Sequence, residues 1–270
     1  MQDVDTKAPD VVEKVAPCDL LAAANNRGCV VAEVHRHYPA YACTLKTGIT
    51  LTPEFERKLL AGFGVNVGLA CGHGCTYCSS KALFRCHPVF RQLGVSAFRN
   101  RDAIIDGKSV ERVERDARRA TKRGLVLLCT ASDAWSPEAQ ALGLGRGCSE
   151  AILKEQGWSL RVLTKNAAVT GDFGLFEKHR SRVMIGLSTS FLPAHSAAAA
   201  VVEPFASSPE ERLQALHEAH RLGLRTYGML CPLIPTFYPT QAEIDEAFPM
   251  FCLRARRRYS PKSSMLAAAA

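Results

Sequence analysis

The chain has 270 residues and a formal net charge of +8, and 47% of its residues are hydrophobic against 22% that are charged. These values are typical of a soluble globular protein with one large domain or two small ones. No apolar run approaches the ~20 residues of a membrane-spanning helix, and the N-terminal segment alternates charges without an apolar core, which excludes a secretory signal, so we expect a cytoplasmic protein with no membrane contact.

The predicted elements follow an irregular N-terminal extension, residues 1–60, in which we expect one short helix at 53–60. From there short apolar runs alternate with segments of helical period. The runs predict five strands, at 65–69, 125–129, 160–163, 183–187 and 226–233. The other segments predict helices at 109–123, from Ser136-Pro137 to a glycine break, and at 148–156, 172–179, 208–223 and from Thr240 to Pro249. This alternation indicates a parallel sheet with crossover helices.

Two of these helices carry explicit start signals. Ser208-Pro209-Glu210-Glu211 is a capping box with proline at the first helical position, and Thr240-Gln241-Ala242-Glu243 is a second capping box. Gly223 is placed to end the first of the two helices. These signals fix where the last two crossovers begin.

The segment CGHGCTYC, residues 71–78, directly follows the first predicted strand. In barrel-type α/β proteins the chemistry lies at the carboxyl ends of the strands, on the loops that follow them. We therefore expect a partial, open (β/α) barrel of the TIM-like kind. Its core is expected at 61–253, and 254–270 is expected to be a basic, disordered tail.

Positive charge concentrates in two segments, 111–123 (ERVERDARRATKR) and 254–258 (RARRR). Such an excess attracts a polyanion through its field. Acidic residues interrupt the first segment at an i,i+4-like spacing, which is also the pattern of a solvated helix face. Both interpretations stay open, a polyanion-binding surface or a solvated face with a basic tail.

The chain has eleven cysteines, and an odd number in a chain without a secretory signal argues against a disulfide framework. Three of them, Cys71, Cys75 and Cys78, fall within eight residues and require an explanation. The others lie at no tight spacing, and we expect most of them to be buried thiols; they are Cys18, Cys29, Cys43, Cys86, Cys129, Cys148, Cys231 and Cys252.

Three thiolates at this spacing can share one metal centre. A structural zinc site needs a fourth protein ligand, and zinc modules usually have a second close pair about 12 to 20 residues downstream. Here only Cys86 and His87 follow, and they are adjacent in sequence. His73 is a poor fourth ligand, because it lies in a short loop whose neighbouring cysteines, Cys71 and Cys75, already serve as ligands. The alternative is a [4Fe–4S] cluster with three cysteine ligands, which leaves one iron open for a substrate or cofactor.

Cys-x3-Cys-x2-Cys with an aromatic residue, here Tyr77, before the last cysteine resembles the signature of the radical S-adenosylmethionine (radical SAM) superfamily. The resemblance implies a [4Fe–4S] cluster on Cys71, Cys75 and Cys78, with its open iron chelating SAM. It also implies reductive cleavage of SAM to methionine and a 5′-deoxyadenosyl radical, with an electron from a flavodoxin- or ferredoxin-type donor. In such enzymes the cofactor carries the chemistry, and the protein positions and shields it.

Further segments resemble the spore photoproduct lyase-like group, whose members are also described as DNA repair photolyases. GLACGHGCTYCSS resembles its cysteine loop, and CTASDAWSPE (129–138) resembles its second-strand end. Later segments resemble the group in the same order, namely LTKN (163–166), GLSTS (186–190), EPFASSPEERLQAL (203–216) and CPLIP (231–235). The resemblance covers about 65–235, and it implies a lyase-type radical SAM enzyme with nucleic acid as a candidate substrate.

The same resemblance implies contacts to SAM from the first strand ends. Tyr77 is expected at the adenine. Ser132 and Asp133 are expected at the amino group, where Asp133 would accept a charge-assisted hydrogen bond from the ammonium. The resemblance also places Cys129 as a hydrogen-atom donor to a substrate radical, although Ala131 lengthens the spacing by one residue. The plainer interpretation of Cys129 is a small core residue that ends its strand.

Three residues of later strands complete the implied SAM site. Lys165 is expected to neutralise the SAM carboxylate, and Ser188 and Ser190 are expected to bond the ribose or the carboxylate. Each also fits a plainer role, Lys165 as a solvated strand-end charge and the serines as polar strand residues. In the same way, Glu203 and Arg212 fit a local ion pair at a helix entry.

The sequence also departs from the group. Ala134 and Trp135 stand where the group has proline and tyrosine, and FCLRARRRY after residue 250 is too basic for the buried sixth strand of the common radical SAM core. The barrel is then more open, truncated, or completed by a partner. Two alternatives of function therefore stay open, a structural zinc protein that binds nucleic acid and a truncated, inactive radical SAM relative.

Overall fold

The computed structural model describes residues 31–35, 38–93, 102–238 and 240–251, which form a mixed α/β protein with two sheets. The larger sheet has six strands in the order β10-β9-β8-β7-β4-β3. Five of them run parallel, and β3 pairs antiparallel with β4 at one edge. The strands are β3 (Ile49–Leu51), β4 (Phe63–Val65), β7 (Leu125–Leu128), β8 (Ser159–Thr164), β9 (Val183–Thr189) and β10 (Arg225–Leu230). The predicted parallel sheet is confirmed, and four of its five predicted strands correspond to β7, β8, β9 and β10.

Helices connect these strands, as predicted. They are α5 (Ser109–Arg119), α6 (Pro137–Ala141), α7 (Leu144–Leu153), α8 (Phe173–Lys178), α9 (Ser196–Val202), α10 (Pro209–Arg221) and α11 (Gln241–Phe251). The capping box of α10 forms with both of its hydrogen bonds, and Gly223 follows the helix with a φ of +73°. The break after α6 falls at Gly143 in the left-handed conformation, so α7 begins four residues before the predicted Cys148.

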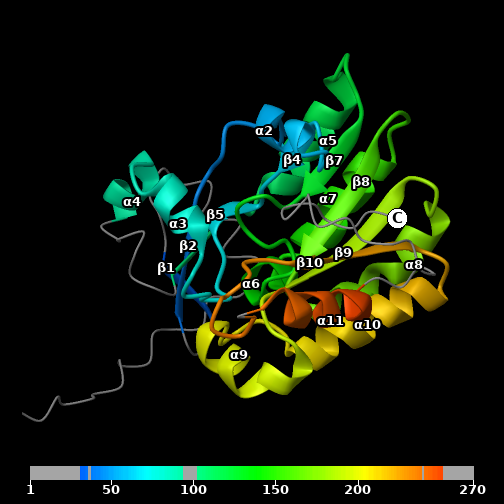
Figure 1. Ribbon diagram of the computed structural model, residues 1–270. Helices are drawn as coiled ribbons and strands as arrows, with labels where there is room; N and C mark the ends of the chain where they lie inside the picture. Colours follow the sequence, from blue (N-terminus) through cyan, green and yellow to red (C-terminus); the bar gives the residue numbers. More distant parts are fainter. Residues whose placement is uncertain (1–30, 36–37, 94–101, 239, 252–270) are drawn as a thin grey trace, which may run out of the picture.

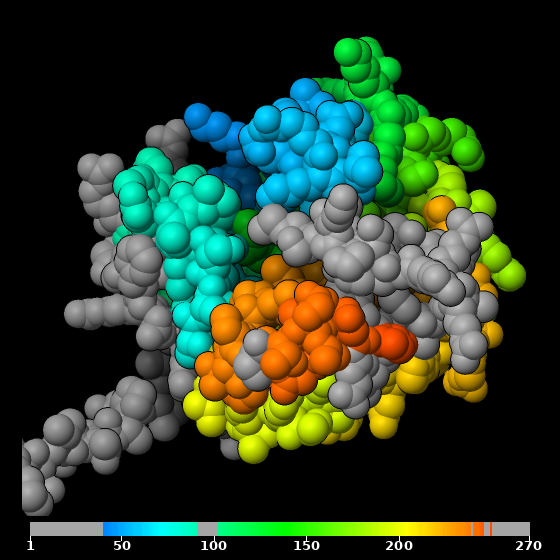
Figure 2. Space-filling model, viewed as in Figure 1, coloured from blue at the N-terminus to red at the C-terminus, as the bar shows by residue number. Residues whose placement is uncertain are grey.

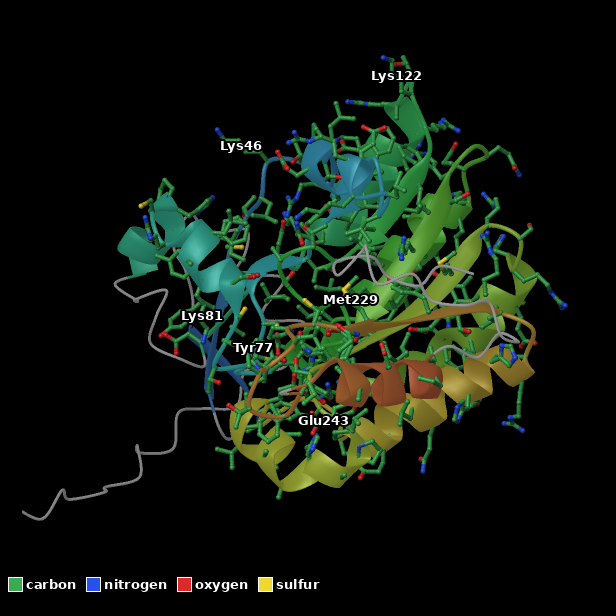
Figure 3. The ribbon with its side chains drawn as sticks, viewed as in Figure 1. Lys46, Tyr77, Lys81, Lys122, Met229 and Glu243 are labelled. Atoms are coloured by element: carbon green, nitrogen blue, oxygen red, sulfur yellow. The ribbon has the colours of Figure 1, made fainter. Side chains whose placement is uncertain are left out.

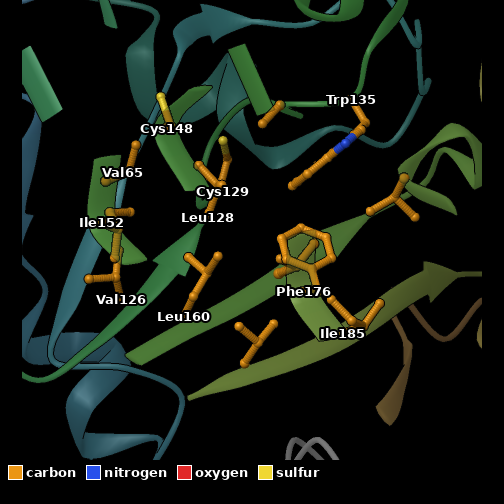
Figure 4. Packing of buried hydrophobic residues seen from close by; sticks show 14 of the residues in the cluster. Val65, Val126, Leu128, Cys129, Trp135, Cys148, Ile152, Leu160, Phe176 and Ile185 are labelled. Atoms are coloured by element: carbon orange, nitrogen blue, oxygen red, sulfur yellow. The ribbon is translucent and has the colours of Figure 1, made fainter. Parts of the chain in front are cut away.

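The main core lies between one face of the larger sheet and its helices. Val126, Leu160 and Ile185 from three neighbouring strands are fully buried there. Ile152 of α7 and Phe176 of α8 pack against them (Figure 4). This layer fixes the spacing of the strands and therefore the positions of the loops at their carboxyl ends.

The irregular extension predicted for residues 1–60 is wrong for its described part. β1 (Val31–His35) and β2 (Tyr38–Ala42) join β6 (Ala103–Ile105) and β5 (Gly68–Ala70) in a smaller sheet of order β1-β2-β6-β5. Figure 1 shows this sheet, with α3 (Ser79–Phe84) and α4 (Pro88–Leu93), on one flank of the larger one. These strands have three to five residues, and β2 and β5 pair with β6, which lies more than 30 residues further along the chain, so they leave little local periodicity.

The single strand predicted at 65–69 is two strands that belong to different sheets. β4 ends at Val65 and β5 begins at Gly68. Between them Asn66 turns toward β7, where its Oδ1 accepts from the N–H groups of Thr130 (2.9 Å) and Ala131 (2.7 Å). The cysteine segment therefore leaves the smaller sheet beside the end of the larger one.

Two predictions fall outside the described residues, the basic tail at 254–270 and the question of a sixth strand after residue 250. Within the described part, β10 and β3 are the edges of the larger sheet. The short helix predicted at 53–60 is α2 (Pro53–Arg57). None of the helices in the described ranges has the length and apolarity that a bilayer crossing demands.

Candidate functional site

The cysteine loop, residues 71–78, connects β5 to α3 and is anchored along its length. The Gly72 N–H donates to Glu138 Oε1 (2.9 Å), and the Thr76 N–H donates to the Val202 carbonyl (3.0 Å). Gly74 has a φ of +67°, a left-handed conformation that glycine adopts at low cost, and it reverses the chain between the first two cysteines. Hydrogen bonds to Glu138 and Val202, outside the loop, thus hold it in place.

His73 is the deepest anchor of this loop, with 1% of its surface exposed. Its two ring nitrogens face acceptors, Asp133 Oδ2 at 3.0 Å and the Phe205 carbonyl at 3.0 Å, so a doubly protonated ring satisfies both. Burial alone lowers the pKa of His73, but the Asp133 carboxylate outweighs it and the net shift is upward. Both nitrogens are therefore engaged, and His73 is not placed to serve as a fourth metal ligand.

The three thiols of the loop lie close enough to act on one another electrostatically. Burial raises the pKa of Cys71 well above its usual range, and Glu138, Asp133 and the other two cysteines raise it further. Burial also raises the pKa of Cys75 to about 12. Since thiolates are the metal ligands, a bound cation must displace these protons and hold the charge.

The donor set of the loop suits a metal centre with three thiolate ligands, Cys71, Cys75 and Cys78. A structural zinc site takes four protein ligands, and both ring nitrogens of His73 already face other acceptors. In a [4Fe–4S] cluster each cysteine binds its own iron, so three cysteines would hold three of the four irons.

A second group of side chains meets beside the loop. Tyr77 reaches from the cysteine loop toward the second half of the chain (Figure 3), where its hydroxyl donates to Glu203 and accepts from Ser190 Oγ (3.0 Å). Lys165 Nζ donates to Glu203 Oε1 (2.9 Å) and to Ser188 Oγ (3.3 Å). Lys165 Nζ also lies 5.4 Å from the centre of the Tyr77 ring.

Arg212 completes this group, which we call the Glu203 cluster (Tyr77, Lys165, Ser188, Ser190, Glu203 and Arg212). Its guanidinium donates to the second carboxylate oxygen of Glu203 and to the Ser188 carbonyl (3.0 Å). The side chains of Glu203 and Arg212 are 0% and 1% exposed, and that of Lys165 is 14% exposed. Two cations thus share one carboxylate, which leaves an excess positive charge of one in a buried place.

Burial shifts the pKa values of this cluster toward neutral forms. Burial lowers the pKa of Lys165 to about 8, and the charge of Arg212 adds to this shift. Burial raises the pKa of Glu203. The positive charge of Arg212 opposes this rise but does not cancel it. An added anionic group would relieve the excess positive charge, so the cluster is suited to a carboxylate of a ligand.

Asp133 is already engaged by the protein. Its carboxylate accepts from His73, from Thr164 Oγ1 (2.8 and 2.9 Å) and from the N–H groups of Lys165 (2.8 Å) and Trp135 (2.9 Å). It therefore links the end of β7 to the end of β8 and to the cysteine loop. The expected contact of Asp133 with the SAM amino group stays a prediction, and such a contact would have to share these donors.

Ser132 and Cys129 lie deeper at the same strand end. Ser132 Oγ is buried and has no hydrogen-bond partner of normal geometry among the described residues, and its hydroxyl lies near the Cys129 thiol. Cys129 is 5% exposed and belongs to the main core, where Figure 4 shows it near Cys148. Burial raises the pKa of Cys129 well above its usual range. The structure places Cys129 in the core, and its role as a hydrogen-atom donor stays a prediction.

The basic segment 111–123 is largely neutralised by neighbouring acids. Arg118 pairs with Glu114 (3.6 Å), Arg115 with Asp116 (2.8 Å), and Arg123 with Glu155 (3.5 Å). These ion pairs agree with the interpretation of a solvated helix face. The described part of this segment gives no support for a polyanion-binding surface.

The geometry can now be compared with that of known proteins. No family model matches the chain. Among solved structures, the likeness lies at the level of the fold. The fold resembles that of spore photoproduct lyase. A mutant of spore photoproduct lyase with dinucleoside spore photoproduct matches with a TM-score of 0.53 and 14% identity, over 78% of this chain and 55% of the lyase.

A second spore photoproduct lyase structure, a mutant with bound AdoMet and the same dinucleoside, matches with a TM-score of 0.51 and 14% identity, over 81% of this chain and 58% of the lyase. This chain thus spans a little over half the length of spore photoproduct lyase. Two sequence relatives are uncharacterized proteins. MJ0683 of Methanocaldococcus jannaschii is 25% identical over 191 residues, which are 70% of this chain and 67% of that protein. ORF301 of Acidianus two-tailed virus is 24% identical over 66% of this chain and 58% of that protein.

Glu203 and Arg212 are the site residues that sequence reasoning missed. As the plainer interpretation held, they form an ion pair near a helix entry, but the pair also binds side chains from the cysteine loop and β8. Glu203 lies 126 residues from Tyr77 and 38 residues from Lys165. Only their position within the resembling segment 203–216 hinted at a role, since no local pattern reports contacts at such separations.

Proposed function

We propose that this protein is a radical SAM enzyme that binds a [4Fe–4S] cluster through Cys71, Cys75 and Cys78 and acts as a lyase on nucleic acid. The partial, open barrel of that superfamily is the architecture proposed with it. The observation that carries the proposal is one hydrogen-bonded network, in which Tyr77 and Lys165 bind Glu203, Ser190 binds Tyr77 and Ser188 binds Lys165. These four residues come from three separate segments, and the resemblance implies a SAM contact for each of them.

The residues of the cluster have complementary tasks in this proposal. The bound iron–sulfur group supplies the one-electron reduction that cleaves SAM. Lys165, held by Glu203, pairs with the SAM carboxylate, since the buried site carries an excess positive charge. Tyr77 presents its ring toward the adenine, and Ser190 and Ser188 bond the ribose or the carboxylate. The low exposure of these side chains excludes water from the reacting atoms.

The proposed substrate class rests on the fold neighbours alone. Spore photoproduct lyase is recorded with a dinucleoside spore photoproduct, which makes a nucleic-acid substrate the first to test here. Fold likeness at 14% identity does not fix a substrate, so the reaction on SAM is tested first.

The test is anaerobic reconstitution with iron and sulfide, followed by SAM and dithionite. We expect a brown protein with about four irons per chain that releases 5′-deoxyadenosine. The Cys75→Ala variant, whose substitution removes one thiol from the loop, is expected to be pale and inactive. A colourless protein that holds one zinc would instead identify the structural zinc alternative. A brown protein that leaves SAM intact would identify the inactive relative.

A further inference from the structure

Glu138 is a buried carboxylate that lies against the first cysteine of the loop. It is 0% exposed and belongs to the first turn of α6, 66 residues along the chain from Gly72, whose N–H it accepts at 2.9 Å. Gly72 directly follows Cys71. Burial is the largest cause of the raised pKa of Cys71, and the Glu138 charge is the next, so the carboxylate lies within electrostatic reach of that sulfur.

The protein holds the two acids beside this cysteine in different ways. Asp133 pairs with the ring of His73 at 3.0 Å. Glu138 accepts from two neutral donors, the N–H of Gly72 and the hydroxyl of Ser136 (2.5 Å). Neutral donors fix the position of a carboxylate without removing its charge. The loop is therefore anchored by a group that also brings negative charge to the proposed centre.

Water reaches the loop at its other end. A groove of about 610 Å³ lies between α2 and α3, and its lining includes Ser79 and Ser80, which follow Cys78. Figure 2 shows this hollow between the blue segment that contains α2 and the cyan segment that contains α3. Glu138 is not among the described residues that line the groove, and it is fully buried. Its charge is therefore little screened by solvent.

Nearby charge and hydrogen bonds to the sulfurs both set the reduction potential of an iron–sulfur centre. A negative charge disfavours the added electron, whereas a backbone N–H that donates to a sulfur favours it. We propose that Glu138 lowers the reduction potential of the centre on the cysteine loop. Its carboxylate holds a buried negative charge beside Cys71 and takes the Gly72 N–H away from the sulfurs. The inference rests on the proposed function, because it assumes the centre, and a lower potential makes electron transfer to SAM more favourable.

The experiment measures the reduction potential of the reconstituted protein without SAM, by a potentiometric titration followed by electron paramagnetic resonance. Glu138→Gln keeps the size of the side chain and an oxygen for the Gly72 N–H, but it removes the charge. Glu150→Gln is the matched control, because it makes the same change on the surface of α7, where the side chain is 48% exposed. Ser136→Ala disturbs the same buried contact and leaves the charge of Glu138 in place.

We expect Glu138→Gln to shift the one-electron equilibrium at least 10-fold toward the reduced centre, which is a rise in potential of about 59 mV or more. The potential of Glu150→Gln should equal that of the wild type, and Ser136→Ala should not raise it. The iron content of all three variants should stay at the wild-type value.

Three results would overturn the inference: a Glu138→Gln potential equal to that of the wild type, an equal rise in Ser136→Ala, or a Glu138→Gln protein that takes up no iron. The last result would make Glu138 a residue of assembly and not of potential. Failure of the proposed function is separable, since the iron content and 5′-deoxyadenosine release of the wild type report it without any variant. A wild-type protein that holds the cluster, with a potential that Glu138→Gln leaves unchanged, would remove only the role of Glu138.

Discussion

Replacing Glu203 by glutamine should destabilise the protein strongly, even without any cofactor. The substitution keeps the size of the side chain but removes the one carboxylate that pairs with Arg212 and Lys165, which are 1% and 14% exposed. Removing one partner of a buried ion pair costs about 3–5 kcal/mol, because it leaves uncompensated buried charge. For a chain of this length, a loss of 3 kcal/mol corresponds to a fall in Tm of roughly 6–12 °C.

The assay is urea unfolding of the metal-free protein, followed by circular dichroism, with Glu150→Gln as the control. Glu150 pairs with Arg146 at the surface, where their side chains are 48% and 52% exposed, so its substitution should cost less than about 1 kcal/mol. If Glu203→Gln costs no more than the control, then Arg212 and Lys165 do not depend on this carboxylate. The reasoning on the cluster would then be refuted.

Three further predictions concern other parts of the fold. Gly186→Ala should cost about 1–3 kcal/mol, because a Cβ there would lie 2.1 Å from the buried Tyr227 ring, whereas Gly171→Ala meets no atom within 4 Å and should be neutral in the same urea assay. Ser208→Ala should cost about 1 kcal/mol by thermal unfolding, since it removes the cap of α10. Burial raises the pKa of Asp133, but the histidine of the cysteine loop and the N–H donors outweigh it and hold the pKa below its usual value. Its stabilisation is therefore complete above the unfolded pKa of about 3.9 and is lost as pH falls below it, so wild-type stability should drop more steeply below about pH 4 than that of Asp133→Asn.

The sequence was most informative where one strand or helix carries its own signal. Four of the five parallel strands, β7 to β10, are apolar runs buried by helices, and α10 begins with a complete capping box, so local patterns sufficed for these. The smaller sheet was missed because its strands are brief and are joined by distant pairs such as Ala40 with Ala103. Pairing of that kind is decided by tertiary contacts and not by periodicity.

In the candidate site, too, the sequence predicted what has a local signal and missed what tertiary contacts decide. The cysteine spacing is local and predicts a metal-binding loop, and the strand-end residues follow from the order of resembling segments along the chain. Two features of the polar network could not be predicted: that Glu203 binds Tyr77 and Lys165, and that Asp133 is engaged by His73, Thr164 and backbone donors. Both depend on which side chains face each other across the ends of adjacent strands.

The anchoring of the cysteine loop bears on how the proposed cluster would be taken up. His73, Gly72 and Thr76 tie the loop to Asp133, Glu138 and Val202 through contacts that involve no thiol. Small zinc modules, in contrast, fold only when the ion arrives. Under the proposed function, these contacts would order the cysteine loop before any iron binds, and the cluster would enter a loop that its neighbours already hold.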